Sequence, residues 1–451
     1  MQHSKLIITA ALAALWGGAA HAAVSAEEAK ALGTTLTPMG AEKAGNKDGS
    51  IPAYTGGEKP PASYKGGHTL PNPYAGEKPK AVITQANAAQ YSDKLTAGAK
   101  ELLKKFPDFR MDLYPTHRSA AFPQKVIDAT MKNATQAKTK DGGVSIEGAW
   151  GGTPFPIPKD GAEVMWNHLT TYKGIGYTYK LAAYNVDAAG NVVQSNGGQG
   201  FVDFPYYGAP NAEVSKGVFF RLKTYTDAPA RRNGEKLIVL DHLNPLETGR
   251  RAWQYLPGQR RTKLSPDVSY DTPQPGTAGT TTYDDTFIFN GAMDRFDWKL
   301  VGKKEMIVPY NMYSFIYEKD IPGKLAGPKF ANPDYVRWEL HRVWVVEATL
   351  KPGSRHIYAK RTFYIDEDTW AALASDSYDA RGQLYRAGFS APVAIYTDKG
   401  TFADTQFYYD FIAGTWVIGA HPGLGGGPKM ITELMADREW GPDSLSGTGI
   451  R

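Results

Sequence analysis

The residues best suited to catalysis are five carboxylates in the last third of the chain. Asp366, Glu367 and Asp368 are consecutive, and Asp376 and Asp379 follow shortly after them. Two carboxylates facing each other across a cleft would supply the acid and the base of glycoside hydrolysis. All five, however, stand at or beside expected turns, where Asp is favoured because its side chain bonds to nearby backbone amides. The turn interpretation is preferred, and hydrolysis remains the alternative.

Other arrangements typical of active sites are incomplete. The nine His residues are dispersed, with His341 and His356 the closest pair, and no HExxH spacing indicates a catalytic zinc. Ser390 lies in a stretch resembling a nucleophile elbow, but Pro392 replaces the final Gly. Residues 423–429 (GLGGGPK) lack the spacing of a phosphate-binding loop. We therefore predict no catalytic residues, no metal site and no cofactor, and a protein that is not an enzyme.

Aromatic side chains are the remaining candidates for ligand binding, since the chain holds 26 Tyr, 18 Phe and 10 Trp. Their rings bury large areas and stack on flat or chain-like ligands, although many must simply belong to the core. Arg361 joins them because it lies on an otherwise apolar face of residues 356–365, where it must be paired or must reach a polar part of a cavity. The candidate cavity-lining residues are Trp253, Tyr255, Trp298, Trp344, Arg361, Phe363, Phe407, Tyr409 and Trp416.

Positive charge is concentrated between Lys216 and Lys263, where eleven basic residues stand against four acidic ones. This patch would suit anionic lipid headgroups or an acidic partner. The alternative is a set of solvated strand faces whose long side chains cover aromatic rings. The formal net charge of the whole chain, +5, is too small to indicate a nucleic-acid partner. The candidate residues for docking to a membrane or partner are Arg231, Arg232, Arg250, Arg251, Arg260 and Arg261.

The first 22 residues have the features of a cleavable signal peptide. Lys5 provides the positive start, residues 6–20 form an apolar stretch, and Ala20-His21-Ala22 fits the small-x-small cleavage rule. A transmembrane anchor is the alternative, but the stretch is short for a spanning helix. The chain has no Cys, which excludes disulfides, thiolate metal sites and a lipoprotein anchor. We expect a soluble periplasmic protein that begins near Ala23.

Composition and periodicity divide the remaining chain into four parts. Residues 23–83 are rich in Gly, Pro and Lys and predict an extended surface arm. Residues 84–173 hold helical patterns at 84–106, 123–138 and 160–172, with Asp160 as an N-cap. Residues 174–420 change to a period of two, which predicts an antiparallel sheet. Residues 421–451 are expected to form a C-terminal loop or tail.

The fold class predicted from these patterns is mostly β with α. The strands number roughly nine to twelve, more than a flat sheet carries comfortably, so strong curvature or partial closure is expected. The N-terminal helices would cover or plug the curved sheet. Within the sheet region, residues 264–285 form a long polar loop that is a candidate lid or portal.

Three segments of this chain resemble a known bacterial family. They are RRAWQYLPGQRR (250–261), FNGAMDRFDWKLVGKKEMIVPYN (289–311) and the strand-rich block 337–386. The family comprises Gram-negative periplasmic proteins of unknown function that are often described as outer-membrane lipoprotein-sorting-protein-like. The resemblance implies an unclosed β-barrel like that of LolA and LolB, and binding of a lipid or other hydrophobic molecule between the inner and outer membranes. It also implies an RND-type transporter and an outer-membrane β-barrel protein as partners, and it brings no catalytic residues.

The leading hypothesis is therefore a non-enzymatic periplasmic carrier of a lipid or other hydrophobic ligand. The alternatives are a carbohydrate-binding or carbohydrate-processing protein, and a scaffold of an outer-membrane complex. Cavity chemistry discriminates between them, because a carrier needs a deep apolar pocket, whereas a sugar site needs an open cleft with stacked rings.

Overall fold

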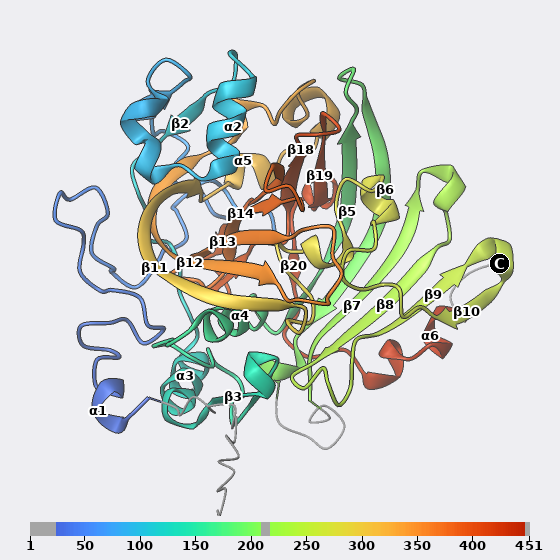
Figure 1. Cartoon of the computed structure of the whole chain (residues 1–451), viewed down its shortest axis with the longest axis horizontal. Coiled ribbons are helices and arrows are strands. Elements are labelled where there is room, and N and C mark those ends of the chain that lie inside the picture. Colours follow the sequence, from blue (N-terminus) through green and yellow to red (C-terminus); the bar gives the residue numbers. More distant parts are fainter. Residues whose placement is uncertain (1–23, 209–216, 447–451) are drawn as a thin grey trace, which may run out of the picture.

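The computed structural model describes residues 24–208 and 217–446, so the predicted signal peptide lies outside the described residues. One sheet of sixteen strands forms the body of the protein, and helices and irregular segments cover it (Figure 1). Within the described ranges, no helix has both the length and the apolar character needed to cross a membrane.

The main sheet draws its strands from almost the entire chain. They are β1 (Ala81–Ile83), β2 (Met111–Leu113), β5 (Gly176–Val186), β6 (Val192–Asp203), β7 (Val218–Ala228), β8 (Lys236–His242), β9 (Arg251–Leu256), β10 (Arg261–Leu264), β11 (Phe296–Pro309), β12 (Trp338–Leu350), β13 (Lys360–Asp366), β14 (Ala372–Tyr378), β15 (Leu384–Ser390), β18 (Gln406–Asp410), β19 (Thr415–His421) and β20 (Lys429–Met430). Two separate hairpins pair β3 (Lys138–Lys140) with β4 (Ser145–Glu147), and β16 (Val393–Ile395) with β17 (Gly400–Phe402).

The sheet is open and mixed. Its strands follow the order β1-β2-β12-β13-β14-β15-β18-β19-β5-β6-β7-β8-β9-β10, while β11 pairs with β12 and β20 with β5. The pairing of β2 with β12 is parallel, and the other pairings are antiparallel. Register shifts at Ala183/Tyr184 and Gly197/Gly198 mark β-bulges, which bend strands and increase twist. The sheet therefore curves without closing, and the predicted fold class is confirmed.

The sheet extends beyond the region 174–420 in which the sequence predicted it. Strands β1 and β2 come from the segment predicted to be the arm and the helices, and β20 comes from the segment predicted to be a tail. These strands have only two or three residues each, too few for a period of two to be recognised in the sequence. The sheet consequently has more strands than the nine to twelve expected.

Helices lie mainly before the sheet region, as predicted. They are α1 (Ala26–Ala29), α2 (Ala97–Lys105), α3 (Gln124–Gln136), α4 (Gly161–Leu169), α5 (Tyr313–Ile316) and α6 (Asp443–Ser446). The pattern at 84–106 is divided in two, because Thr96 is extended and its side chain caps α2 by accepting from the Ala99 amide. Asp160 caps α4 as predicted, accepting from the Glu163 amide at 2.9 Å.

Strands β7 to β10 extend away from the main core as a wing (Figure 1), and side chains from other segments pack on both of its faces. On one face lie residues 431–446, where Trp440 and Leu445 of the C-terminal segment pack against Ile238 and Tyr255. On the other face, Val268 packs against Val239 and Ala252. The segment predicted to be a C-terminal tail is thus an integral layer of the fold.

Candidate ligand cavity

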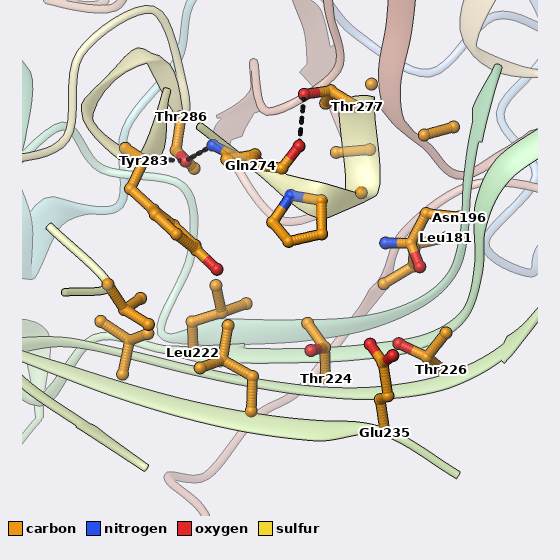
Figure 2. A pocket seen from close by; sticks show the side chains of 18 of the residues that line it. Leu181, Asn196, Leu222, Thr224, Thr226, Glu235, Gln274, Thr277, Tyr283 and Thr286 are labelled. Atoms are coloured by element: carbon orange, nitrogen blue, oxygen red, sulfur yellow. Dashed lines mark hydrogen bonds between the residues drawn. The ribbon is translucent and has the colours of Figure 1, made fainter. Parts of the chain in front are cut away.

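A cavity of about 380 Å³ lies between one face of the main sheet and residues 265–290. Strands β5 to β9 form its floor, and the segment that joins β10 to β11 forms its roof (Figure 2). Many of its lining side chains are apolar. They are Tyr179, Leu181, Ala183, Phe220, Leu222, Leu237, Val239, Leu256, Val268 and Phe287.

Alternation along the wing strands selects which side chains reach this cavity. Successive side chains of a strand point to opposite faces of the sheet. In β7, Leu222, Thr224 and Thr226 face the cavity, whereas Arg221 and Lys223 face the C-terminal segment, where both lie over the Trp440 ring. The cavity face of β7 is therefore neutral, and its charged residues point away.

Hydrogen bonds attach the roof, residues 265–290, to the floor. The Ser195 hydroxyl donates to the Gly276 carbonyl at 2.8 Å, and the Asn185 amide donates to the Thr277 carbonyl at 2.7 Å. Within the roof, the Gln274 amide donates to the Thr286 hydroxyl at 2.8 Å, as Figure 2 shows. The polar loop predicted as a lid or portal is thus the cover of the cavity, held at several points along its length.

A buried ion cluster fixes the end of the roof. The Arg361 guanidinium donates to Asp284 at 3.1 Å and to Asp285 at 2.8 Å, and His356 lies 3.0 Å from Asp284. Burial by itself would raise the pKa of Asp284, but the charge of Arg361 and the hydrogen bond with His356 outweigh it and hold that pKa well below its usual value. The Tyr358 hydroxyl also donates to Asp285 at 2.8 Å. The roof therefore ends on a network that is ionised and hydrogen-bonded.

Each charged side chain that reaches the cavity wall has a partner within the protein. Arg232 pairs with Glu235 at 2.8 Å, and Arg250 donates two hydrogen bonds of 2.7 Å to Asp241. Asp404 is completely buried and pairs with Lys173 at 2.5 Å. Burial raises the pKa of Asp404, and Lys173 opposes that rise.

None of the nine residues predicted to line a cavity lies in this one. Trp253 and Tyr255 of β9 belong to the opposite face of the wing, because their neighbours Gln254 and Leu256 take the cavity face. The other six aromatic residues pack in or against the main core. They are Trp298, Trp344, Phe363, Phe407, Tyr409 and Trp416. Arg361 was predicted either to be paired or to reach a polar part of a cavity, and the structure shows that it is paired.

The six arginines predicted to dock a membrane or partner divide into two groups. Arg231, Arg251, Arg260 and Arg261 are exposed, at or near the outer strands of the wing. Arg232 and Arg250 instead line the cavity, where their ion pairs hold them. Part of the basic region between Lys216 and Lys263 therefore lies in the cavity wall rather than on the surface.

The carboxylates considered for catalysis have structural partners. Arg118 donates to both oxygens of Asp368, at 2.6 and 2.9 Å, and Asp376 accepts from the amides of Ala97 and Gly98 at the start of α2. His341, Asp366 and Asp368 each offer a ligand atom within 4.8 Å of the others, so this group could hold a metal ion. Arg118 already supplies a positive charge there.

The sequence prediction missed the residues that do line the cavity because most of them are ordinary strand residues. Leu222, Leu237 and Val239 have no feature that separates them from core residues. The sequence of β7 does distinguish its two faces. Leu222, Thr224 and Thr226 lie on one face, and Arg221, Lys223 and Tyr225 lie on the other. That contrast indicates two different faces, although not which face is hollow.

Comparison with known proteins assigns the family. The chain matches the family described as "Protein of unknown function (DUF1329)" over residues 82–446. PA3922, an uncharacterized protein of Pseudomonas aeruginosa, is 44% identical over 402 residues, which cover 88% of each chain. A solved DUF1329 family protein from Desulfovibrio piger has 16% identity and a TM-score of 0.40, and the match covers 60% of this chain and 91% of that one. The LolA superfamily protein NE2245 from Nitrosomonas europaea has 11% identity and a TM-score of 0.38, covering 64% and 100% respectively. The chain belongs to the DUF1329 family of proteins of unknown function.

Proposed function

We propose that this protein is a non-enzymatic carrier that holds one hydrophobic or amphipathic small molecule in the cavity under residues 265–290. The observation that carries the proposal is the apolar wall formed by Leu181, Leu222, Leu237 and Val239 beneath a polar cover. A volume of about 380 Å³ lies within the range of small-molecule sites, and burial of apolar surface there would drive binding.

The proposed location is the periplasm, where the signal-like residues 1–22 would direct the chain. Transfer of a ligand between the inner and outer membranes, with an RND-type transporter and an outer-membrane β-barrel protein as partners, is part of the same proposal. The exposed Arg251, Arg260 and Arg261 at the end of the wing are the proposed docking residues for an acidic partner or membrane surface.

Carbohydrate binding has weaker support. Its motivation was an array of rings available for stacking, but Trp298, Trp344 and Trp416 pack in or against the core. A role as a scaffold for an outer-membrane complex would leave the cavity unexplained. The carrier is therefore the function that we put forward.

The test is binding of the uncharged fluorophore N-phenyl-1-naphthylamine to the purified protein, together with mass spectrometry of molecules extracted from it. Leu222→Trp places a large side chain in the cavity and should weaken binding of the fluorophore at least about tenfold, because protein interiors are close-packed. Val193→Trp, at a residue of β6 that is 58% exposed, is the matched control and should leave binding unchanged. Equal binding by all three proteins would contradict the proposal.

A further inference from the structure

The cavity wall carries no unmatched charge that a charged ligand could neutralise. Arg232 bonds to Glu235 through Nε at 2.9 Å, and its Nη1 donates to the Ser195 carbonyl and the Asn196 side chain at 3.3 Å. Arg250 adds a 2.8 Å bond to the Asn290 carbonyl to its two bonds with Asp241. A carboxylate or phosphate entering this cavity would find these cations already engaged.

The other charged side chains that line the cavity are Lys236 and Asp404, and they too have partners within the protein. Lys236 donates to the Leu445 carbonyl at 2.8 Å, on the opposite face of the wing. Asp404 is held by Lys173, whose ammonium group also lies 4.2 Å from the centre of the Phe287 ring. Burying an ion without a partner is costly, whereas a buried hydroxyl or amide needs only a hydrogen bond.

Neutral polar groups, by contrast, remain available to a ligand. Across residues 24–208 and 217–446, no protein partner is found for the hydroxyls of Thr224 and Thr226 or for the amide nitrogens of Asn196 and Gln254. Figure 2 places Asn196, Thr224 and Thr226 near one end of the cavity, beside Glu235, and Leu222 farther along the floor. Asn196, Thr224 and Thr226 thus form a polar group at one end, where Leu181 also lies, and the Tyr283 hydroxyl points into the cavity on the side of Leu222.

Resting on the carrier function above, we infer that the ligand is a neutral amphiphile with hydroxyl, carbonyl or amide groups at one end. Those groups bind Asn196, Thr224, Thr226 and Gln254, and the apolar part lies along Leu222, Leu237 and Val239. The cavity volume of about 380 Å³ is near the lower end of the range for small-molecule sites. That size fits a single chain or a compact ring system rather than a lipid with several acyl chains.

The first experiment compares three ligands of equal chain length as competitors of N-phenyl-1-naphthylamine at pH 8. They are 1-decanol, decanoate and decyltrimethylammonium. 1-Decanol should bind at least about tenfold more tightly than either ion, because its hydroxyl needs no counter-charge in the cavity. Equal or tighter binding of an ion would overturn the inference and leave the carrier function intact. Failure of the fluorophore and of all three competitors to bind would instead overturn the carrier function.

The second experiment removes one half of an internal ion pair. Glu235→Gln leaves Arg232 without its carboxylate, so decanoate should bind at least about tenfold more tightly than to the wild type, with 1-decanol changed less than about threefold. The double variant Arg232→Gln, Glu235→Gln has no charge at these two positions and should bind decanoate as weakly as the wild type does. Unchanged binding of decanoate to a folded Glu235→Gln variant would overturn the inference.

Discussion

At the scale of single residues, Arg361 illustrates how one side chain can determine the position of a distant segment. It is completely buried, and its partners Asp284 and Asp285 lie 77 and 76 positions away in the sequence. The rings of Phe289, Tyr358 and Phe363 surround its guanidinium group at 4.9 to 5.4 Å. The cluster links β13 in the core to the end of the cavity roof.

Replacing Arg361 should therefore destabilise the fold and release the roof. Arg361→Met leaves two buried carboxylates without their main counter-charge, which costs about 3–5 kcal/mol of unfolding free energy. Urea unfolding followed by Trp fluorescence measures the loss, and faster hydrogen exchange in residues 265–290 would locate it. The triple variant Arg361→Met, Asp284→Asn, Asp285→Asn removes all three charges and should be more stable than Arg361→Met alone. A loss below about 1 kcal/mol for Arg361→Met would contradict this role.

At the scale of elements, the cavity roof is the segment whose position controls access to the site. It is long, it contains only short helical turns at Pro275–Thr277 and Tyr283–Asp285, and side-chain hydrogen bonds rather than a strand ladder join it to the floor. Side-chain hydrogen bonds can break without disturbing the strands below, so we expect the roof to open before the sheet does. Ligand entry is expected to require that opening.

A reversible lock on the roof tests this expectation. A Cβ atom added at Gly276 would lie 3.5 Å from Asn196 Cγ, the atom that a sulfur replaces in Asn196→Cys, so the double variant Asn196→Cys, Gly276→Cys suits a disulfide. The native chain has no Cys, so no other disulfide competes. Oxidation should slow entry and release of N-phenyl-1-naphthylamine at least about tenfold, and dithiothreitol should restore both rates. Identical rates in the oxidised and reduced proteins would show that the roof need not open.

At the scale of the whole molecule, two buried histidines connect helices to the sheet in a manner that requires them to be neutral. His168 of α4 donates through Nε2 to the Phe289 carbonyl at 2.9 Å and accepts through Nδ1 from the Ala372 amide at 3.1 Å. His421 of β19 makes the same pair of bonds with Phe315 of α5 and with Gly423. Burial lowers the pKa of both histidines to about 4. Protonation would place a second N–H against an amide donor.

Acid should therefore weaken the fold through these two residues. Between pH 6.5 and 4 the unfolded chain binds more protons than the folded one, so stability falls as the pH falls, by about 2 kcal/mol per histidine from pH 7.5 to 5. His168→Gln and His421→Gln should be less stable at pH 7.5 but should each lose about 2 kcal/mol less on acidification than the wild type. Urea midpoints at the two pH values give the comparison. An unchanged pH dependence in both variants would contradict it.

Asp366 has the opposite effect on the pH dependence of stability. The contribution of each histidine must therefore be measured with a variant of that histidine alone. Burial, together with the neighbouring Asp368, raises the pKa of Asp366 to about 6. Its folded form binds a proton more readily than its unfolded form, so its contribution to stability is present at low pH and is lost as the pH rises from about 4 to 6. The pH profile of the wild type is the sum of these opposing contributions.

Much of the architecture could be predicted from the sequence alone. Strands β5 to β9 all lie within residues 174–420, where the sequence predicted strands from a period of two bounded by Gly, Pro or Asn. The N-cap at Asp160 and the open, curved, mostly β fold were predicted as well. These features depend on the conformational preferences of consecutive residues and on the number of strands, and both can be inferred from short stretches of sequence.

The candidate site could not be predicted in the same way, because its identity depends on contacts between distant segments. Alternation separates Leu222 and Gln254 from Arg221 and Trp253, but it does not say which face is hollow. In this protein both faces of the wing are covered, one by Trp440 and its neighbours and the other by the roof. The roof arches over its face and leaves the cavity of about 380 Å³, whereas Trp440 and Leu445 of the C-terminal segment pack directly on Ile238 and Tyr255.

The sequence by itself determined the long strands of residues 174–420, the helices that precede them, the open, curved, mostly β fold and the family to which the chain belongs. Only the tertiary structure decided that aromatic residues fill the core and that Leu, Val and Thr line the cavity. It also decided that Arg232, Arg250 and Arg361 are internal ion-pair partners. The physical reason is that burial and charge pairing are properties of two segments meeting in space, and the residues of one segment do not specify what the other brings to it.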